Sequence, residues 1–106
     1  MKIKKYVTAD NNGPFETWMQ KLKDKRAKAQ ILIRLDRIIQ AGHFGDHKSV
    51  GNDVYELRIT EGKGYRVYYA HEGNTIILLL CGGSKATQSK DIKLAKQYWS
   101  DYNANS

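Results

Sequence analysis

The chain has 106 residues, of which 41% are hydrophobic and 27% charged, and its 18 lysines and arginines outnumber 11 acidic residues to give a net charge of +7. This length predicts one globular domain, residues 1–106, with a core of its own. No apolar run approaches the roughly 20 residues that cross a bilayer, which excludes a membrane-spanning protein. The positive charge favours an acidic partner: nucleic acid, an anionic membrane or an acidic protein.

The compartment is predicted from the cysteine content and the N-terminal segment. Cys81 is the only cysteine, which excludes an internal disulfide and fits a reducing cytoplasm. It ends an apolar run, so we expect a buried and unreactive thiol. Residues 2–7 alternate like a strand and lack the apolar core of a signal peptide, so we expect a cytoplasmic protein.

Two helices are predicted after the first strand. The first covers residues 15–22, with Pro14 in its first turn. The second runs from Lys25 to Ala41, because Asp24 can cap its start and Gly42 its end. Its polar face is expected to be solvated, with the option of extending a nucleic-acid footprint; it carries Lys25, Arg26, Lys28, Arg34 and Arg37.

The glycine-rich segment from His43 to Asp53 is predicted to be an irregular loop. His43 and His47 are four residues apart, but the segment has no helical pattern and no other ligand nearby. No metal site is therefore predicted here.

A β-hairpin is predicted next, because residues 54–60 and 65–70 alternate at period two and the segment between them, Glu61-Gly62-Lys63-Gly64, contains two glycines. The two apolar faces must lie on the same side of the sheet, which restricts the loop to an odd number of residues. A three-residue loop places Arg58 opposite Arg66 and Glu56 opposite Tyr68. A five-residue loop places Arg58 opposite Tyr68 instead.

The last elements are a strand and a helix. Residues 75–81 are apolar on both faces, as in a central strand, and the segment Gly82–Lys85 is expected to break it. A helix capped by Thr87 or Ser89 then runs to about Tyr102. The order predicts an α+β domain: a small antiparallel sheet with two N-terminal helices and a C-terminal helix packed on one side. The polar side of the hairpin stays open in this prediction.

Positive side chains gather on that open face. Arg58 and Arg66 lie there with Glu56, and Lys85 leaves the adjacent strand at a similar level. One interpretation is a solvated cluster in which Glu56 is the counter-charge. The other is that the arginines bind a phosphate, which a guanidinium can hold through two hydrogen bonds.

Four stretches together resemble the RelE/ParE superfamily of type II toxin–antitoxin toxins, and more narrowly its HigB-like addiction module killer protein branch. They are Tyr55-Glu56-Leu57-Arg58-Ile59, Gly64-Tyr65-Arg66-Val67-Tyr68-Tyr69, Leu80-Cys81-Gly82-Gly83-Ser84-Lys85-Ala86-Thr87-Gln88, and Asp91-Ile92 through Tyr98-Trp99. The resemblance implies a toxin that cleaves mRNA on the translating ribosome without a metal or other cofactor. It also implies a cognate antitoxin with a helix-turn-helix domain, as in HigA.

The resemblance also implies site residues. Arg58, Arg66 and Lys85 match the basic residues that hold the scissile phosphate. His47 lies in the loop where the HigB type carries a histidine, and Asp91 lies near the position of its acidic or histidine residue.

Cleavage without a metal needs a base for the 2′-OH, cations for the phosphorane and an acid for the leaving oxygen. Glu56 is the predicted base. Tyr68, Lys85 and Asp91 are candidate acids, and Tyr68 is alternatively a ring on which a base stacks.

Two other functions compete with this hypothesis. A ParE-like toxin would inhibit DNA gyrase by binding it, without chemistry, and a simple RNA-binding domain would cleave nothing. The inhibitory antitoxin is expected to cover the face around Arg58, Arg66 and Lys85. Docking on the N-terminal helices, around Trp18, is the alternative.

Overall fold

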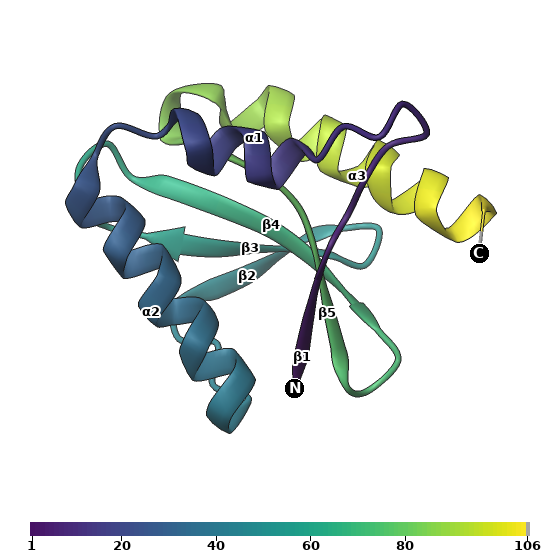
Figure 1. Cartoon of the computed structure of the whole chain (residues 1–106), viewed down its shortest axis with the longest axis horizontal. Coiled ribbons are helices and arrows are strands. Elements are labelled where there is room, and N and C mark those ends of the chain that lie inside the picture. Colours follow the sequence, from purple (N-terminus) through teal and green to yellow (C-terminus); the bar gives the residue numbers. More distant parts are fainter. Residues whose placement is uncertain (106) are drawn as a thin grey trace.

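The computed structural model describes residues 1–105, and Ser106, the last residue of the predicted domain, lies outside the described residues. Three helices surround one sheet (Figure 1). The elements in chain order are β1 (Lys2–Lys5), α1 (Pro14–Lys21), α2 (Lys25–Ala41), β2 (His47–Gly51), β3 (Val54–Ile59), β4 (Tyr65–Glu72), β5 (Ile76–Ser84), a 3₁₀ turn (Lys85–Thr87) and α3 (Gln88–Ala104).

The five strands form a mixed sheet in the order β1-β5-β4-β3-β2. The α+β class is confirmed, but the prediction of an antiparallel sheet is wrong, because β1 pairs with β5 in parallel. The other neighbouring strands are antiparallel. A sequence pattern records which residues are apolar and not which strand will lie beside which, so the pairing of the first strand with the last was not visible in it.

The sheet has a hydrophobic core on each face. Leu57 and Val67 belong to the core under α1 and α2, whereas Val54 and Ala70, of opposite parity on the same strands, pack against α3. The prediction that all helices pack on one side is therefore wrong. Strand β5 is apolar on both faces, and α3 covers the face of β3 and β4 that was expected to be open.

The start and end of α2 are those expected. The Ala27 N–H donates to Asp24 Oδ1 at 3.0 Å, and Gly42 adopts φ +63° at the C-terminus, where only glycine avoids strain. Arg34, however, is half-buried rather than part of a solvated face. Its guanidinium donates to the backbone oxygens of Phe44, Asp46 and Arg58 at 2.8, 2.9 and 2.6 Å, and so fastens α2 to the sheet.

The predicted loop 43–53 contains strand β2, which pairs with β3 at the edge of the sheet. Four of its five residues are exposed, so its sequence lacks the alternation of apolar and polar side chains from which a strand is predicted. Its strand character comes from the edge of β3, which offers backbone partners.

Strand β5 continues through Gly82 and Gly83 to Ser84, past the expected break. The two glycines serve close packing instead. A β-carbon on Gly82 would collide with the Trp18 ring of α1, and one on Gly83 would collide with the Asp91 carboxylate of α3. Helices on both faces can therefore approach this strand closely.

Candidate functional site

Of the two hairpin registers that the sequence allowed, the structure has the one expected for a three-residue loop: Arg58 pairs with Arg66, and Glu56 pairs with Tyr68. All four side chains start from the α3-facing side of β3 and β4. Because α3 covers that side, Glu56 and Tyr68 are fully buried, whereas Arg58 remains one-third exposed.

The Glu56 carboxylate is the centre of the arrangement. Its Oε1 accepts from Arg58 Nε at 3.2 Å and lies 3.6 Å from Arg66 Nε. Its Oε2 accepts from the Tyr68 hydroxyl at 3.2 Å and from Gln88 Nε2, at the start of α3, at 2.6 Å. Two cations that would repel each other across the strands therefore share one buried counter-charge.

The two arginines differ in what else they contact. Arg66 Nη1 donates to the backbone oxygens of Gly64 and Tyr65, both at 3.1 Å, and the Arg66 side chain is 12% exposed. Within residues 1–105, Arg66 Nε is a buried nitrogen that makes no hydrogen bond. Arg58 lies 3.9 Å from Asp46 Oδ1, a weak second contact that leaves its guanidinium edge accessible.

Lys85 joins the arginines at the hairpin turn. Its N–H donates to Gly64 O at 2.9 Å, and its side chain is exposed. The point that a β-carbon would occupy on Gly64 lies 3.6 Å from Arg66 Nη1 and 3.7 Å from Lys85 Cβ. Arg66 and Lys85 thus flank the same turn, and with Arg58 they make a cationic site that suits a phosphate.

Tyr68 does not fit the role of a stacking ring. Its side chain is fully buried, so no ring face is open to a nucleotide. Burial first, and then the Glu56 carboxylate that accepts its hydrogen bond, raise the pKa of its hydroxyl. Tyr68 is held as a neutral donor to Glu56, a role in which it does not release its proton.

Asp91 and His47 lie outside the hydrogen bonds of the Glu56 cluster. Asp91 is 8% exposed, and its Oδ2 accepts from Thr87 Oγ1 at 2.5 Å. His47 pairs with Leu57, which points to the α2 side, and its ring contacts that of Phe44 on that side. The structure therefore does not bring His47 to the face that carries Glu56.

The sequence analysis missed three residues that contact the candidate site residues. Gln88 donates a hydrogen bond to Glu56, Thr87 donates one to Asp91, and Asp46 forms an ion pair with Arg58. Gln88 and Thr87 lie in a stretch that carries the family resemblance, but nothing in their spacing reveals that α3 folds back over Glu56.

Among the described residues, no group of three or more His, Cys, Asp and Glu side chains could hold a metal ion. In that same part of the chain, every helix is too short or too polar to cross a membrane.

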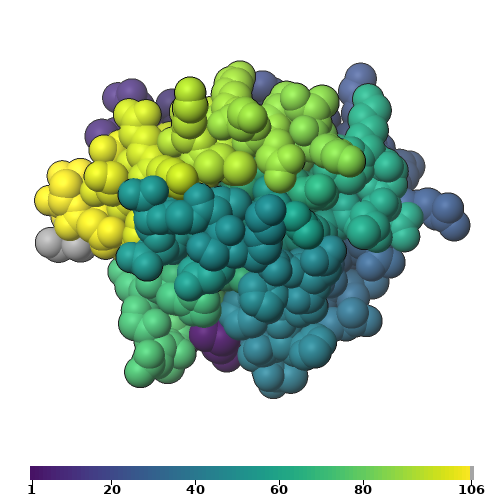
Figure 2. Space-filling view, turned by 180° about the vertical axis from the view of Figure 1, so that it is seen from behind, coloured from purple at the N-terminus to yellow at the C-terminus, as the bar shows by residue number. Residues whose placement is uncertain are grey.

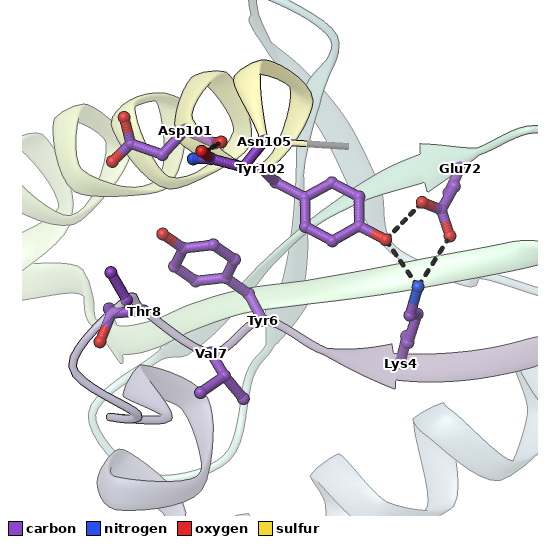
Figure 3. Close-up of a pocket in the computed structure, with 9 residues that line it drawn as sticks. Lys4, Tyr6, Val7, Thr8, Glu72, Asp101, Tyr102 and Asn105 are labelled. Carbon is purple, nitrogen blue, oxygen red and sulfur yellow. Dashed lines mark hydrogen bonds and ion pairs between the residues drawn. The ribbon is translucent and has the colours of Figure 1, made fainter.

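A hollow of about 660 Å³ lies between β1 and the end of α3 and shares no lining residue with the Glu56 cluster (Figure 3). Lys4 Nζ donates to the Tyr102 hydroxyl at 2.6 Å and to Glu72 at 3.3 Å, and the Tyr102 hydroxyl donates to Glu72. The Tyr102 hydroxyl, followed by Lys4, lowers the pKa of the Glu72 carboxyl. These contacts anchor the C-terminal half of α3, while Gln88 anchors its beginning.

Comparison with known proteins gives two matches. Residues 17–100 match the family described as "Phage derived protein Gp49-like (DUF891)". A protein of Haemophilus influenzae (strain Rd), named only as an uncharacterized protein, is 55% identical over 82 residues, which are 77% of this chain and 82% of that protein. The family's toxins act in addiction modules and imply a cognate antitoxin. This chain belongs to the Gp49-like family, within the RelE/ParE-like toxin superfamily of addiction modules.

Proposed function

We propose that the protein is the toxin of a HigB-like type II module, and that it is an endoribonuclease which cleaves mRNA on the translating ribosome in the cytoplasm. The observation that carries the proposal is the cationic site formed by Arg58, Arg66 and Lys85, with two of its members held by one buried carboxylate. A surface that only docks on a protein does not need such a buried counter-charge behind it.

The chemistry follows from the RNA itself. The 2′-oxygen attacks the neighbouring phosphorus as its proton passes to a water molecule, and the bond to the 5′-oxygen breaks as that oxygen gains a proton. The products are a 2′,3′-cyclic phosphate and a 5′-OH end. Arg58 and Arg66 would stabilise the charge on the phosphorane, and one well-placed donor of this kind is worth about 100- to 1,000-fold in rate. Lys85, which is exposed, would give the proton to the leaving oxygen.

Glu56 has a different role in this proposal from the base first expected. Its side chain is fully buried, and both of its oxygens already accept hydrogen bonds. We therefore assign it as a positioning residue that sets the direction of the two arginines.

The test is to incubate the purified protein with translating ribosomes and to map the mRNA ends. We expect new 5′-OH ends, at least about 100-fold fewer with Arg66→Ala or Lys85→Ala, and no change with Arg37→Ala on the exposed side of α2. Circular dichroism checks that each variant folds. If Arg66→Ala unfolds, Lys85→Ala still tests the proposal, because it removes an exposed side chain and should leave the fold intact. A wild-type protein that leaves mRNA intact but blocks gyrase supercoiling would overturn the proposal in favour of the ParE-like function.

We further propose a HigA-like antitoxin with a helix-turn-helix domain that covers the cationic site. An acidic antitoxin would associate quickly with these cations, whereas a basic protein would bind weakly because like charges would face each other. Combining Arg58→Glu with Lys85→Glu should then weaken antitoxin binding strongly. Affinity within a few-fold of wild type would favour docking on α1 and α2 instead.

A further inference from the structure

We propose a second phosphate-binding surface, the α3 lysine face, made of Lys90, Lys93 and Lys96 on α3 together with Lys48 on β2. Its ligand is the sugar-phosphate backbone of the single-stranded RNA that enters the cationic site. The inference rests on the proposed function and adds the path of the substrate.

The four lysines converge on one side of the molecule. α3 turns Ile92, Ala95 and Trp99 towards the sheet, which leaves Lys90 and Lys93 exposed on the outer side. Lys96 reaches across to the β2–β3 turn, where its Nζ lies 3.3 Å from the β-carbon position of Gly51. Figure 2 shows this side, with α3 along the top and the turn beneath it.

Lys48 belongs to the same side because it pairs with Glu56 across β2 and β3. Cross-strand partners point to the same face of a sheet, and the face of Glu56 is the one that α3 covers. The lysines therefore line both sides of the approach to the Glu56 cluster.

These positive charges have no counter-charge within the described residues. None of the four lysines forms an ion pair there, whereas Lys4 and Lys5 of β1 pair with Glu72 and Glu16. The acidic residue in the first turn of α3, Asp91, is buried and hydrogen-bonded to Thr87. An incoming anion would thus meet unneutralised ammonium groups.

Apart from the buried Asp91, the charge order along α3 is the reverse of what stabilises a helix. The N-terminal end of a helix favours negative side chains and the C-terminal end favours positive ones. Here Lys85, Lys90 and Lys93 gather at the N-terminal end, and the last turn carries no basic residue. Lysines near the positive end of the helix dipole destabilise the folded helix. The same lysines and the dipole both attract anions, which favours phosphate binding at this end.

The surface is continuous with the proposed catalytic site, since Lys85 lies three residues before Gln88, the first residue of α3. At about 1.5 Å per residue, Lys90 and Lys96 are about 9 Å apart along the axis. Such a row suits successive phosphates of one strand better than a single small anion.

The test measures binding of a 2′-O-methyl RNA oligomer, which cannot be cleaved because its 2′-oxygen carries no proton. We expect Lys90→Ser/Lys93→Ser/Lys96→Ser to lower the affinity at least tenfold at low salt. We also expect the slope of log K against log salt to become shallower by about 0.7 for each phosphate that the variant no longer neutralises. The matched control, Lys25→Ser/Arg26→Ser/Arg37→Ser, removes the same charge from exposed positions of α2 and should change the affinity less than threefold.

The outcomes separate this inference from the proposed function. Equal losses in both triple variants would mean that only net charge matters and would overturn the inference, as would wild-type RNA affinity in the α3 variant. A loss of antitoxin affinity without a loss of RNA affinity would overturn it in favour of a protein partner. If the α3 variant loses RNA affinity but wild-type protein cleaves nothing, the surface stands and the nuclease proposal fails. If wild-type protein cleaves mRNA but the α3 variant binds RNA with normal affinity, the nuclease proposal stands and the α3 lysine face is not an RNA-binding surface.

Discussion

At the scale of single residues, Glu56 explains why two arginines can face each other across β3 and β4. Breaking a buried ion pair by removing one partner leaves an uncompensated charge, which typically costs about 3–5 kcal/mol. The Arg66 side chain is 12% exposed and would be left in this position. Glu56→Ala should therefore lower the free energy of unfolding by an amount in this range, measured by urea denaturation.

The control for Glu56→Ala is Glu61→Ala in the hairpin turn, a half-buried carboxylate without an ion pair in residues 1–105. Its effect should stay within about 0.5 kcal/mol. Equal effects of the two substitutions would contradict the role given to Glu56.

Cys81 gives a pH dependence whose sign can be worked out. The thiol is buried as expected, and burial, followed by the nearby Asp91, raises its pKa from 9.0 to about 12. The folded state thus keeps the thiol protonated after the unfolded chain has begun to lose its proton. The contribution of the protonated Cys81 thiol to the free energy of unfolding is fully present below pH 9. It is lost as the pH rises towards 12, at up to about 1.4 kcal/mol per pH unit.

The measurement compares wild type with Cys81→Ala by urea unfolding at about pH 8 and about pH 10. Wild type should lose up to about 1.4 kcal/mol more between these values than the variant does. Tyr68 and Tyr69, whose pKa values burial also raises, titrate in both proteins and cancel in the difference. Identical pH slopes would contradict the prediction.

At the scale of elements, Arg34 shows how a charged residue can hold two elements together. Burial lowers the pKa of its guanidinium, which nevertheless donates to three backbone oxygens of the 44–46 segment and β3. Hydrogen bonds from a charged donor contribute about 1.5–3 kcal/mol each, and the three act as a unit. Arg34→Ala should cost at least about 2 kcal/mol, whereas Arg37→Ala, on the exposed side of the same helix, should cost almost nothing. A melting temperature that is the same in both variants would mean that the three bonds do not matter.

The contrast between α2 and β2 shows which elements the sequence can predict. The ends of α2 depend on Asp24 and Gly42, whose effects are local, and they were predicted to the residue. The edge strand β2 depends on the exposed backbone of β3, and no pattern in its own residues reveals it. Arg34 was assigned to solvent for the same reason, because its three partners are distant in sequence.

At the scale of the whole molecule, the placement of α3 decides what the candidate site is. The hairpin alone predicts that Glu56, Arg58, Arg66 and Tyr68 share a face, and the register confirms it. Which of these side chains is buried depends on a helix that begins at Gln88, well beyond the hairpin in the chain, and so Tyr68 and Glu56 were expected at a surface where they do not lie. Apolar residues on both faces of β5 were the available signal that the second face needs a cover.

The charge of the molecule should make its stability and its RNA affinity respond to salt in opposite directions. Within residues 1–105, the basic residues that form ion pairs are Lys4, Lys5, Arg58 and Arg66. Repulsion among the remaining cations therefore dominates at a net charge of +7. Salt shortens the range of this repulsion to about 10 Å at 0.1 M, whereas RNA binding weakens because salt opposes counterion release. The melting temperature should therefore rise by a few degrees from about 0.02 M to 0.3 M NaCl. The rise should be smaller in Lys90→Ser/Lys93→Ser/Lys96→Ser, whose net charge is +7 minus 3, or +4. A melting temperature that falls with salt would mean that the exposed ion pairs outweigh the repulsion.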